Sequence, residues 1–144
     1  MAGMTVDGLD GLIDDLAALA SLPDSVIDDV LNAEADVIVP AQQAEIQRSW
    51  TGPHSLGISA KSVKKGKVKK GKDGRSISIY PQGSRKRGKT STRNAEIAFI
   101  NEYGAPQRGI AARPAIGTAN AKAEQAAVEA GERVYHAYLD SKNL

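Results

Sequence analysis

The N-terminal third of the chain repeats apolar residues at the spacing of an amphipathic helix. Between residues 6 and 22 they recur every three or four positions, and Asp14 and Asp15 lie on the polar side. The apolar positions of this stripe are Leu9, Leu12, Ile13, Leu16 and Leu19. Because Pro23 breaks the pattern, we expect a helix over residues 6–21.

A second helical stripe follows directly and predicts a helix over residues 24–48. Pro40 lies inside it and is expected to end or kink the helix, since proline lacks an N–H and clashes with the preceding turn. A helical continuation towards Trp50 is expected, and Thr51-Gly52-Pro53 breaks it. The stripe consists of Val26, Ile27, Val30, Leu31, Val37 and Ile38.

The middle of the chain changes to a period of two. Apolar and polar residues alternate in two short stretches, which predicts a β-hairpin over residues 56–81. The alternating apolar residues are Leu56, Ile58, Ala60, Ile77 and Ile79. The Gly- and Lys-rich tip between the stretches cannot bury itself, so we expect basic, mobile loops over residues 61–75 and 82–93.

The last third favours two helices. Residues 94–103 fit either a strand or a short helix, and Asn94 as N-cap and Gly104 after the end favour the helix. An Ala-rich stripe with helical period then predicts a helix over residues 114–139, whose alanines allow close approach to a sheet or a neighbouring helix. Its main positions are Ile116, Ala119, Ala123, Ala126 or Ala127, Ala130, Val134 and Tyr138.

Together these elements predict an α+β fold. It comprises N-terminal helices, a small antiparallel sheet with a long basic hairpin, and a C-terminal Ala-rich helix. At 144 residues the chain has the length of a single domain, to which residues 1–22 add a peripheral helix.

Composition predicts a thin core. Hydrophobic residues make up 41% of the chain, but only six residues are aromatic, and the many alanines bury little area each. Burial against further copies of the chain would add stability, which favours an oligomer. The absence of cysteine excludes disulfides, thiol nucleophiles and Cys-based zinc sites. With no apolar run near the roughly 20 residues of a membrane span and no basic region typical of a signal peptide, we expect a soluble protein made in a cytoplasm.

Charge is strongly segregated along the sequence. Residues 1–60 carry ten acidic residues and one basic residue, whereas residues 61–93 carry thirteen basic residues and one acidic residue. Residues 94–144 are nearly balanced, so the net charge of +2 hides a basic middle and an acidic N-terminal part. This asymmetry suits self-assembly between acidic and basic surfaces, or contact with a polyanion.

The basic residues form two clusters that are candidate contact sites. The first consists of Lys61, Lys64, Lys65, Lys67, Lys69, Lys70, Lys72 and Arg75, and the second of Arg85, Lys86, Arg87, Lys89 and Arg93. Such clusters suit contact with a phosphate backbone without base specificity. They contain no aromatic residue for base stacking, which disfavours single-strand recognition. Docking on an acidic protein and a purely solvated tip are the alternative interpretations.

No set of residues predicts catalysis. His54 and His136 each lack a second ligand at metal-binding spacing, and the adjacent pairs Asp14-Asp15 and Asp28-Asp29 point apart on a helix. The glycines between residues 66 and 74 lack the strand-to-helix context of a phosphate-binding loop. We therefore expect a protein that is not an enzyme and has no metal or cofactor.

Residues 101–116 carry the most specific pattern in the chain. Gly104 suits a left-handed reversal, and Pro114 suits the first turn of a helix, where its missing N–H is no loss. Arg113 precedes proline and is therefore extended. A bidentate partner such as Glu102 would lock the loop closed. We therefore expect Arg113 to act as a structural clamp, bonded to a carboxylate or to backbone carbonyl groups; an exposed arginine on a helix-entry loop is the alternative.

The order Glu102-Tyr103-Gly104, a short basic loop and Ala112-Arg113-Pro114 resembles the tail-completion (head–tail joining) proteins of long-tailed bacteriophages. Thr51-Gly52 and Leu56 match the start of that family's β-hairpin. Two departures are Ala115, where the family usually has phenylalanine, and the insertion Pro53-His54-Ser55 before the hairpin.

The resemblance implies a structural role without enzymatic activity. Proteins of that family form a ring, commonly of six copies, between the portal-adaptor (connector) complex of the capsid and the tail tube. The partners it implies are further copies of this chain, the portal-adaptor protein, the tail terminator or tail tube protein, and double-stranded DNA in the channel, bound non-specifically; no membrane contact is expected. The implied location is the virion neck, after assembly in the cytoplasm of a bacterial host. The alternative is a small basic architectural DNA-binding protein, for which residues 61–93 are the argument.

Overall fold

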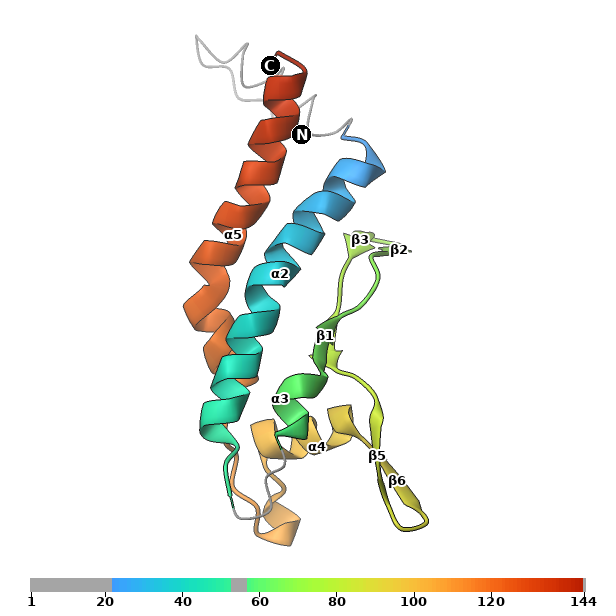
Figure 1. The fold of residues 1–144 in the computed structure, drawn as a ribbon, viewed down its shortest axis with the longest axis vertical. Helices are drawn as coiled ribbons and strands as arrows, with labels where there is room; N and C mark the ends of the chain where they lie inside the picture. The colour runs from blue at the N-terminus through green and yellow to red at the C-terminus, as the bar shows by residue number, and fades with distance from the viewer. Residues whose placement is uncertain (1–21, 53–56, 144) are drawn as a thin grey trace.

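In the computed structural model, which describes residues 22–52 and 57–143, two long helices lie side by side and antiparallel (Figure 1). They are α2 (Asp24–Ser49) and α5 (Ile116–Ser141). The shorter helices α3 (Ile58–Ser62), α4 (Asn94–Tyr103) and the 3-10 helix η1 (Pro106–Arg108) gather at the end where α2 stops and α5 begins.

Short antiparallel strand pairs make up the β part of the described chain. β1 (Val63–Lys65) pairs with β4 (Ile79–Pro81), and β2 (Lys69–Gly71) pairs with β3 (Gly74–Ser76), so the four strands belong to one long hairpin. A second hairpin pairs β5 (Ser84–Arg87) with β6 (Thr90–Arg93). In the chain order, these small sheets come after the long helix α2 and before the long helix α5, which packs against α2. This arrangement confirms the predicted α+β class.

Small side chains bring α5 close to α2. The buried positions of α5 include Ala119, Ala123, Ala127 and Ala130, at the helical spacing that the sequence predicted. Glu45 of α2 adds an ion pair across the interface, because Lys122 Nζ lies 2.7 Å from its Oε1. Hydrogen bonds from Arg48 and Lys122 lower the pKa of the Glu45 carboxyl. The alanine stripe therefore packs on a helix of the same chain.

A small core lies where the end of α2 meets α3, β1, α4 and the start of α5. Its buried residues are Ile46, Trp50, Ala60, Val63, Ala98 and Ala115. Trp50 is the one aromatic residue of this cluster, which agrees with the thin core expected from composition. Because Ala115 belongs to the cluster, the core directly supports the segment 101–116.

Residues 58–62 form the helix α3, so the strand predicted from the alternation of Ile58 and Ala60 is wrong. Gly57 has a φ of +68° and turns the chain immediately before this helix. One helical turn then places Ala60 and Val63 together in the core, which an extended chain at this point would not do. The long hairpin accordingly begins at Val63, while Leu56 lies outside the described residues.

Most of the loop expected over residues 82–93 is the hairpin β5–β6, which begins at Ser84 and ends at Arg93. Arg87 pairs with Thr90 across the two-residue turn of Gly88 and Lys89, and Gly88 has the positive φ (+64°) that such turns require. The tip of the first hairpin is also regularly paired, from Lys69 opposite Ser76 to Gly71 opposite Gly74.

The remaining helices agree with the sequence. α2 and α5 begin and end within two residues of the predicted bounds, and Pro40 lies inside α2 without ending it. Residues 94–103 form a helix, as favoured, but the side chain of Asn94 makes no cap and instead donates to the Gln82 carbonyl oxygen at 2.8 Å. The helix expected over residues 6–21 lies outside the described residues.

Candidate functional site

The segment 101–116 folds into a tight corner between α4 and α5, and Gly104 makes that corner possible. Gly104 has φ +75° and ψ 179°, a conformation that only glycine adopts without strain. A Cβ at this position would lie 2.7 Å from the Ala112 nitrogen and 2.8 Å from the Ile110 carbonyl oxygen. The positive φ expected at Gly104 is confirmed, and the close approach of the loop is a second reason for glycine there.

Glu102 holds the start of α5. Its buried carboxylate accepts the backbone N–H groups of Ala115, Ile116 and Gly117 at 2.8, 2.9 and 2.9 Å. These are amide groups that a helix N-terminus leaves without a partner, and a negative charge there also interacts favourably with the helix dipole. The predicted pairing of Glu102 with Arg113 is therefore wrong, because the carboxylate is already used by the helix N-terminus.

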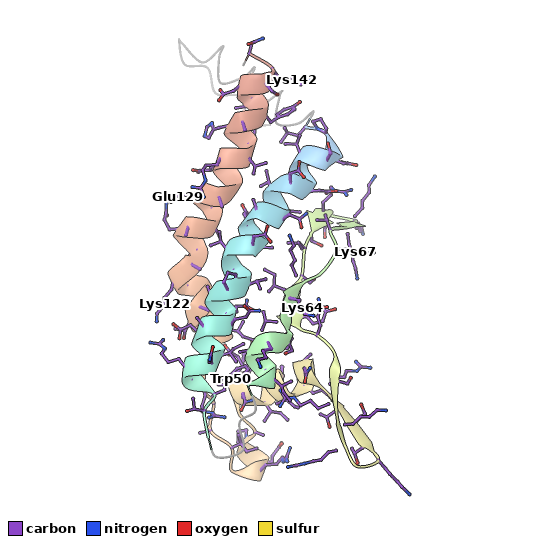
Figure 2. All side chains as sticks on the ribbon, in the orientation of Figure 1. Trp50, Lys64, Lys67, Lys122, Glu129 and Lys142 are labelled. Atoms are coloured by element: carbon purple, nitrogen blue, oxygen red, sulfur yellow. The ribbon has the colours of Figure 1, made fainter. Side chains whose placement is uncertain are left out.

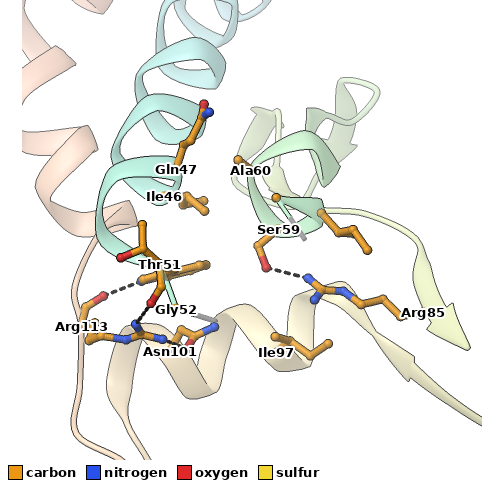
Figure 3. A pocket seen from close by; sticks show the side chains of 13 residues that line it. Ile46, Gln47, Thr51, Gly52, Ser59, Ala60, Arg85, Ile97, Asn101 and Arg113 are labelled. Atoms are coloured by element: carbon orange, nitrogen blue, oxygen red, sulfur yellow. Dashed lines mark hydrogen bonds between the residues drawn. The ribbon is translucent and has the colours of Figure 1, made fainter. Parts of the chain in front are cut away.

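Arg113 does clamp the corner, but through neutral acceptors (Figure 3). Its guanidinium donates to Asn101 Oδ1 at 2.8 Å and to the Thr51 carbonyl oxygen at 3.2 Å. The Arg113 carbonyl oxygen in turn accepts the indole N–H of Trp50 at 2.7 Å. These bonds tie the loop to the end of α4 and to the end of α2.

The other residues of the motif lie on the surface of the corner. Ala112 and Pro114 are exposed, and Tyr103 is 66% exposed, with its ring in tilted contact with that of Phe99 at a centroid distance of 4.8 Å. Pro114 precedes the first helical turn rather than lying inside it, since α5 begins at Ile116.

A cavity of about 290 Å³ lies beside this corner, between the end of α2, α3 and α4. Figure 3 shows Arg85 and Arg113 on opposite sides of it, with Ile46 and Ile97 between them. Its described lining contains no aspartate, glutamate or histidine and thus no general base. Arg85 and Arg113 give its described lining two cationic groups.

The first basic hairpin is partly neutralised by the acidic side of α2. Arg75 forms a bidentate ion pair with Asp28, one bond of which measures 2.7 Å, and lies 3.5 Å from Asp24. The hydrogen bond with Asp28 raises the pKa of Arg75. Lys65 Nζ lies 2.8 Å from Asp36 Oδ1. These two cations are thus engaged within the chain.

The other lysines of the first basic cluster, of which Lys61 lies in α3, form no ion pair with any residue that the structure describes. They are Lys61, Lys64, Lys67, Lys69, Lys70 and Lys72, all of them exposed. Figure 2 shows Lys67 near the tip of this hairpin, away from α5. Of the sequence-predicted cluster, these residues are the ones free to contact a partner.

The second basic hairpin divides in the same way. Arg85 is held by two neutral acceptors, Asn94 Oδ1 at 2.7 Å and Ser59 Oγ at 2.6 Å, and partial burial lowers the pKa of its guanidinium. Lys86, Arg87 and Lys89 are exposed and have no ion-pair partner within the described ranges.

Sequence reasoning missed a groove that joins the second hairpin to the corner. It has a volume of about 550 Å³, and its walls come from α3, β5, β6, α4 and the loop that contains Arg108. Neither Arg108 nor Ile110 was singled out from the sequence, because the groove assembles from three separate segments. The helical spacing of Ile97 and Ile100 was the one local signal of an apolar surface there.

Comparison with models of known protein families, with curated proteins and with solved structures finds no significant match. The family resemblance therefore rests on the motif residues alone. Within residues 22–52 and 57–143, no helix is both long and apolar enough to cross a bilayer. Nor does that part of the chain contain a group of three or more His, Asp or Glu residues arranged to hold a metal ion.

Proposed function

We propose that this chain is a structural subunit of a phage neck, a tail-completion protein that joins head to tail. In this role, copies of the chain form a ring between the portal-adaptor complex and the tail tube or tail terminator, around the channel for double-stranded DNA. The proposal places the protein in the virion, after assembly in the cytoplasm of the host bacterium. It assigns the chain no enzymatic activity and no cofactor.

The observation that carries the proposal is the geometry of the corner. Glu102, Gly104 and Arg113 are the residues on which the family resemblance rests most heavily, and each has a defined contact there. Glu102 caps α5, Gly104 allows the close approach of the loop, and Arg113 ties the loop to α2. These contacts support the proposal because they give the motif residues a structural role at one junction.

The distribution of charge also supports the proposal. The exposed lysines around Lys67 and Lys69 occupy the first hairpin, which runs beside α2 (Figure 1). In a ring, several copies of this hairpin could face one duplex. Phosphate contacts of this kind depend on charge and carry no sequence information. A single copy then binds DNA weakly, whereas a ring of copies surrounds it.

Light scattering on the purified full-length chain, followed by DNA titrations at several salt concentrations, tests this proposal. We expect a mass several times that of one chain and weak binding without sequence preference. The double variant Lys67→Gln/Lys69→Gln should lower the slope of log affinity against log salt by about 1.8 for each subunit in contact, because about 0.9 counterion is released per phosphate contact. The matched variant Arg133→Gln/Lys142→Gln, with the same change of charge at one exposed position of α5 and one directly after it, should leave the slope unchanged.

The architectural DNA-binding protein predicts the opposite pattern. A monomer or dimer that binds DNA tightly at physiological salt would contradict the neck role and favour that alternative. Equal effects of the two double variants on DNA binding would show that the first hairpin is not the contact surface.

A further inference from the structure

The groove between the second hairpin and the corner has an apolar floor. Four isoleucines from three segments line it, and all of them are partly exposed to solvent. They are Ile58, Ile97, Ile100 and Ile110. Partly exposed β-branched side chains that converge in one hollow gain stability when a partner's apolar side chains cover them.

The rim of the same groove is cationic. It carries Arg85, Lys86, Arg87 and Arg108, and its described lining contains no carboxylate. Arg85 is bonded to neutral oxygen atoms, and the other three cations have no ion pair with a described residue. An occupant that suits this groove therefore has apolar side chains on one face and carboxylates beside them.

The chain itself contains a segment with this character. Residues 6–22 have leucine and isoleucine at helical spacing, four aspartates and no lysine or arginine. The aspartates are Asp7, Asp10, Asp14 and Asp15. DNA would satisfy the cations but would leave the isoleucines uncovered. We infer that the groove receives residues 6–22 of a neighbouring copy of this chain.

The positions of the groove and of Leu22 favour a neighbouring copy over the same chain. The groove lies at the end of α2, whereas Leu22 precedes its start at the opposite end of the helical pair (Figure 1). A helix of 26 residues is about 39 Å long, and a helix over residues 6–21 would measure about 24 Å. If residues 6–21 form the helix expected from the sequence, only Leu22 and Pro23 separate it from α2, and it is too short to reach the groove of its own chain.

Such a contact joins unlike surfaces of two copies, the N-terminal segment of one and the groove of the next. Contacts of this head-to-tail type close into rings or continue as filaments. The inference rests on the self-association that the proposed function requires, but it does not depend on a role in the virion.

Disulfide trapping tests the contact directly, because the chain has no cysteine of its own. One preparation carries Leu12→Cys and a second carries Ile110→Cys, and the two are mixed and oxidised. We expect a covalent dimer that contains one chain of each kind. A mixture of Leu12→Cys with Gln125→Cys, at an exposed position of α5, is the matched control and should give at most a trace of such dimer.

A charge exchange provides an independent readout. Asp14→Arg/Asp15→Arg should raise the concentration at which the protein dissociates by on the order of tenfold or more, since both changes place cations against the cationic rim. Mixing this variant with Arg87→Asp/Arg108→Asp should restore association. Arg87→Asp/Arg108→Asp alone should also dissociate, whereas Lys67→Asp/Lys69→Asp, which changes an equal number of charges on the first hairpin, should associate as the unchanged chain does.

Three results would overturn the inference. The first is a monomeric mass at all concentrations, and the second is a Leu12→Cys/Ile110→Cys double variant that cross-links only within one chain. The third is a loss of DNA binding in Arg87→Asp/Arg108→Asp while its association is unchanged. The last would identify the groove as a nucleic-acid site. Trapped dimers from a protein that proves dispensable for head–tail joining would retain the inference and reject the proposed function, so the two failures are distinguishable.

Discussion

Replacement of Gly104 by alanine tests whether the stability of the fold depends on the tight corner between α4 and α5. Two separate penalties apply at this position. The backbone conformation, φ +75° and ψ 179°, is strained for any residue with a Cβ. The new methyl group would also lie 2.7 Å from the Ala112 nitrogen and 2.8 Å from the Ile110 carbonyl oxygen, both of them backbone atoms that cannot rotate away.

The neighbouring Gly109 is a matched control, because alanine there meets one penalty only. Gly109 has a φ of +68° in the left-handed region, and nothing lies within 4 Å of an added Cβ. Gly109→Ala should therefore lower the free energy of unfolding by about 1 kcal/mol. Gly104→Ala combines backbone strain of about 1–3 kcal/mol with steric overlap of about 1–3 kcal/mol, so the expected loss is about 2–6 kcal/mol.

Urea denaturation at one protein concentration measures both variants. Trp50 is a suitable fluorescent reporter, because it is the only tryptophan and its indole N–H is bonded to the corner at the Arg113 carbonyl oxygen. Far-UV circular dichroism reports the two long helices in parallel. A loss for Gly104→Ala that does not exceed the loss for Gly109→Ala would refute the close approach on which the corner depends.

Three further substitutions test other contacts. Glu102→Ala leaves three backbone N–H groups at the start of α5 without their acceptor and should lower the free energy of unfolding, measured in urea, by about 2–4 kcal/mol. Glu102→Gln keeps one oxygen acceptor and should lower it less. Equal losses for the two variants would contradict the role of Glu102 as a helix cap. Hydrogen bonds from Arg48 and Lys122 lower the pKa of Glu45, so its contribution to stability is fully present above the ordinary glutamate pKa of about 4.3 and is lost progressively as the pH falls further. Glu45→Gln should therefore reduce the melting temperature more at pH 7 than at pH 3, and an equal reduction at both would exclude the ion pairs as the cause. Arg75→Gln should lower the urea midpoint because it removes the bidentate bond to Asp28, while Lys67→Gln, the same change of charge on the same hairpin, should leave it unchanged.

The long helices and the corner glycine were predictable because their signals are local. The stripes of α2 and α5 extend over many turns, and the order of Gly104 and Pro114 marks a helix end and a helix start within a short distance. Helix α3 was not predictable in the same way, since Ile58 and Ala60 are too few to distinguish a period of two from a helical turn whose direction Gly57 sets.

The hydrogen-bond partners of individual side chains could not be predicted from the sequence. An acid near a loop arginine suggests an ion pair, but Glu102 binds the N-terminus of α5, and that choice depends on where the helix begins in space. Hairpin β5–β6 has no apolar residue on which periodicity could act, and its anchor is the bond between Arg85 and Asn94. The groove forms only when α3, α4 and this hairpin come together, so no single stretch of sequence indicates it.

Electron microscopy of phage particles assembled without this chain tests the neck assignment most directly. A phage that encodes the chain is grown with a stop codon early in its gene, and heads and tails are counted beside a culture that supplies the protein from a plasmid. The proposed function predicts DNA-filled heads and complete tails that stay separate, and restoration of joined particles by the plasmid. Joined, infectious particles at the normal frequency without the chain would contradict it.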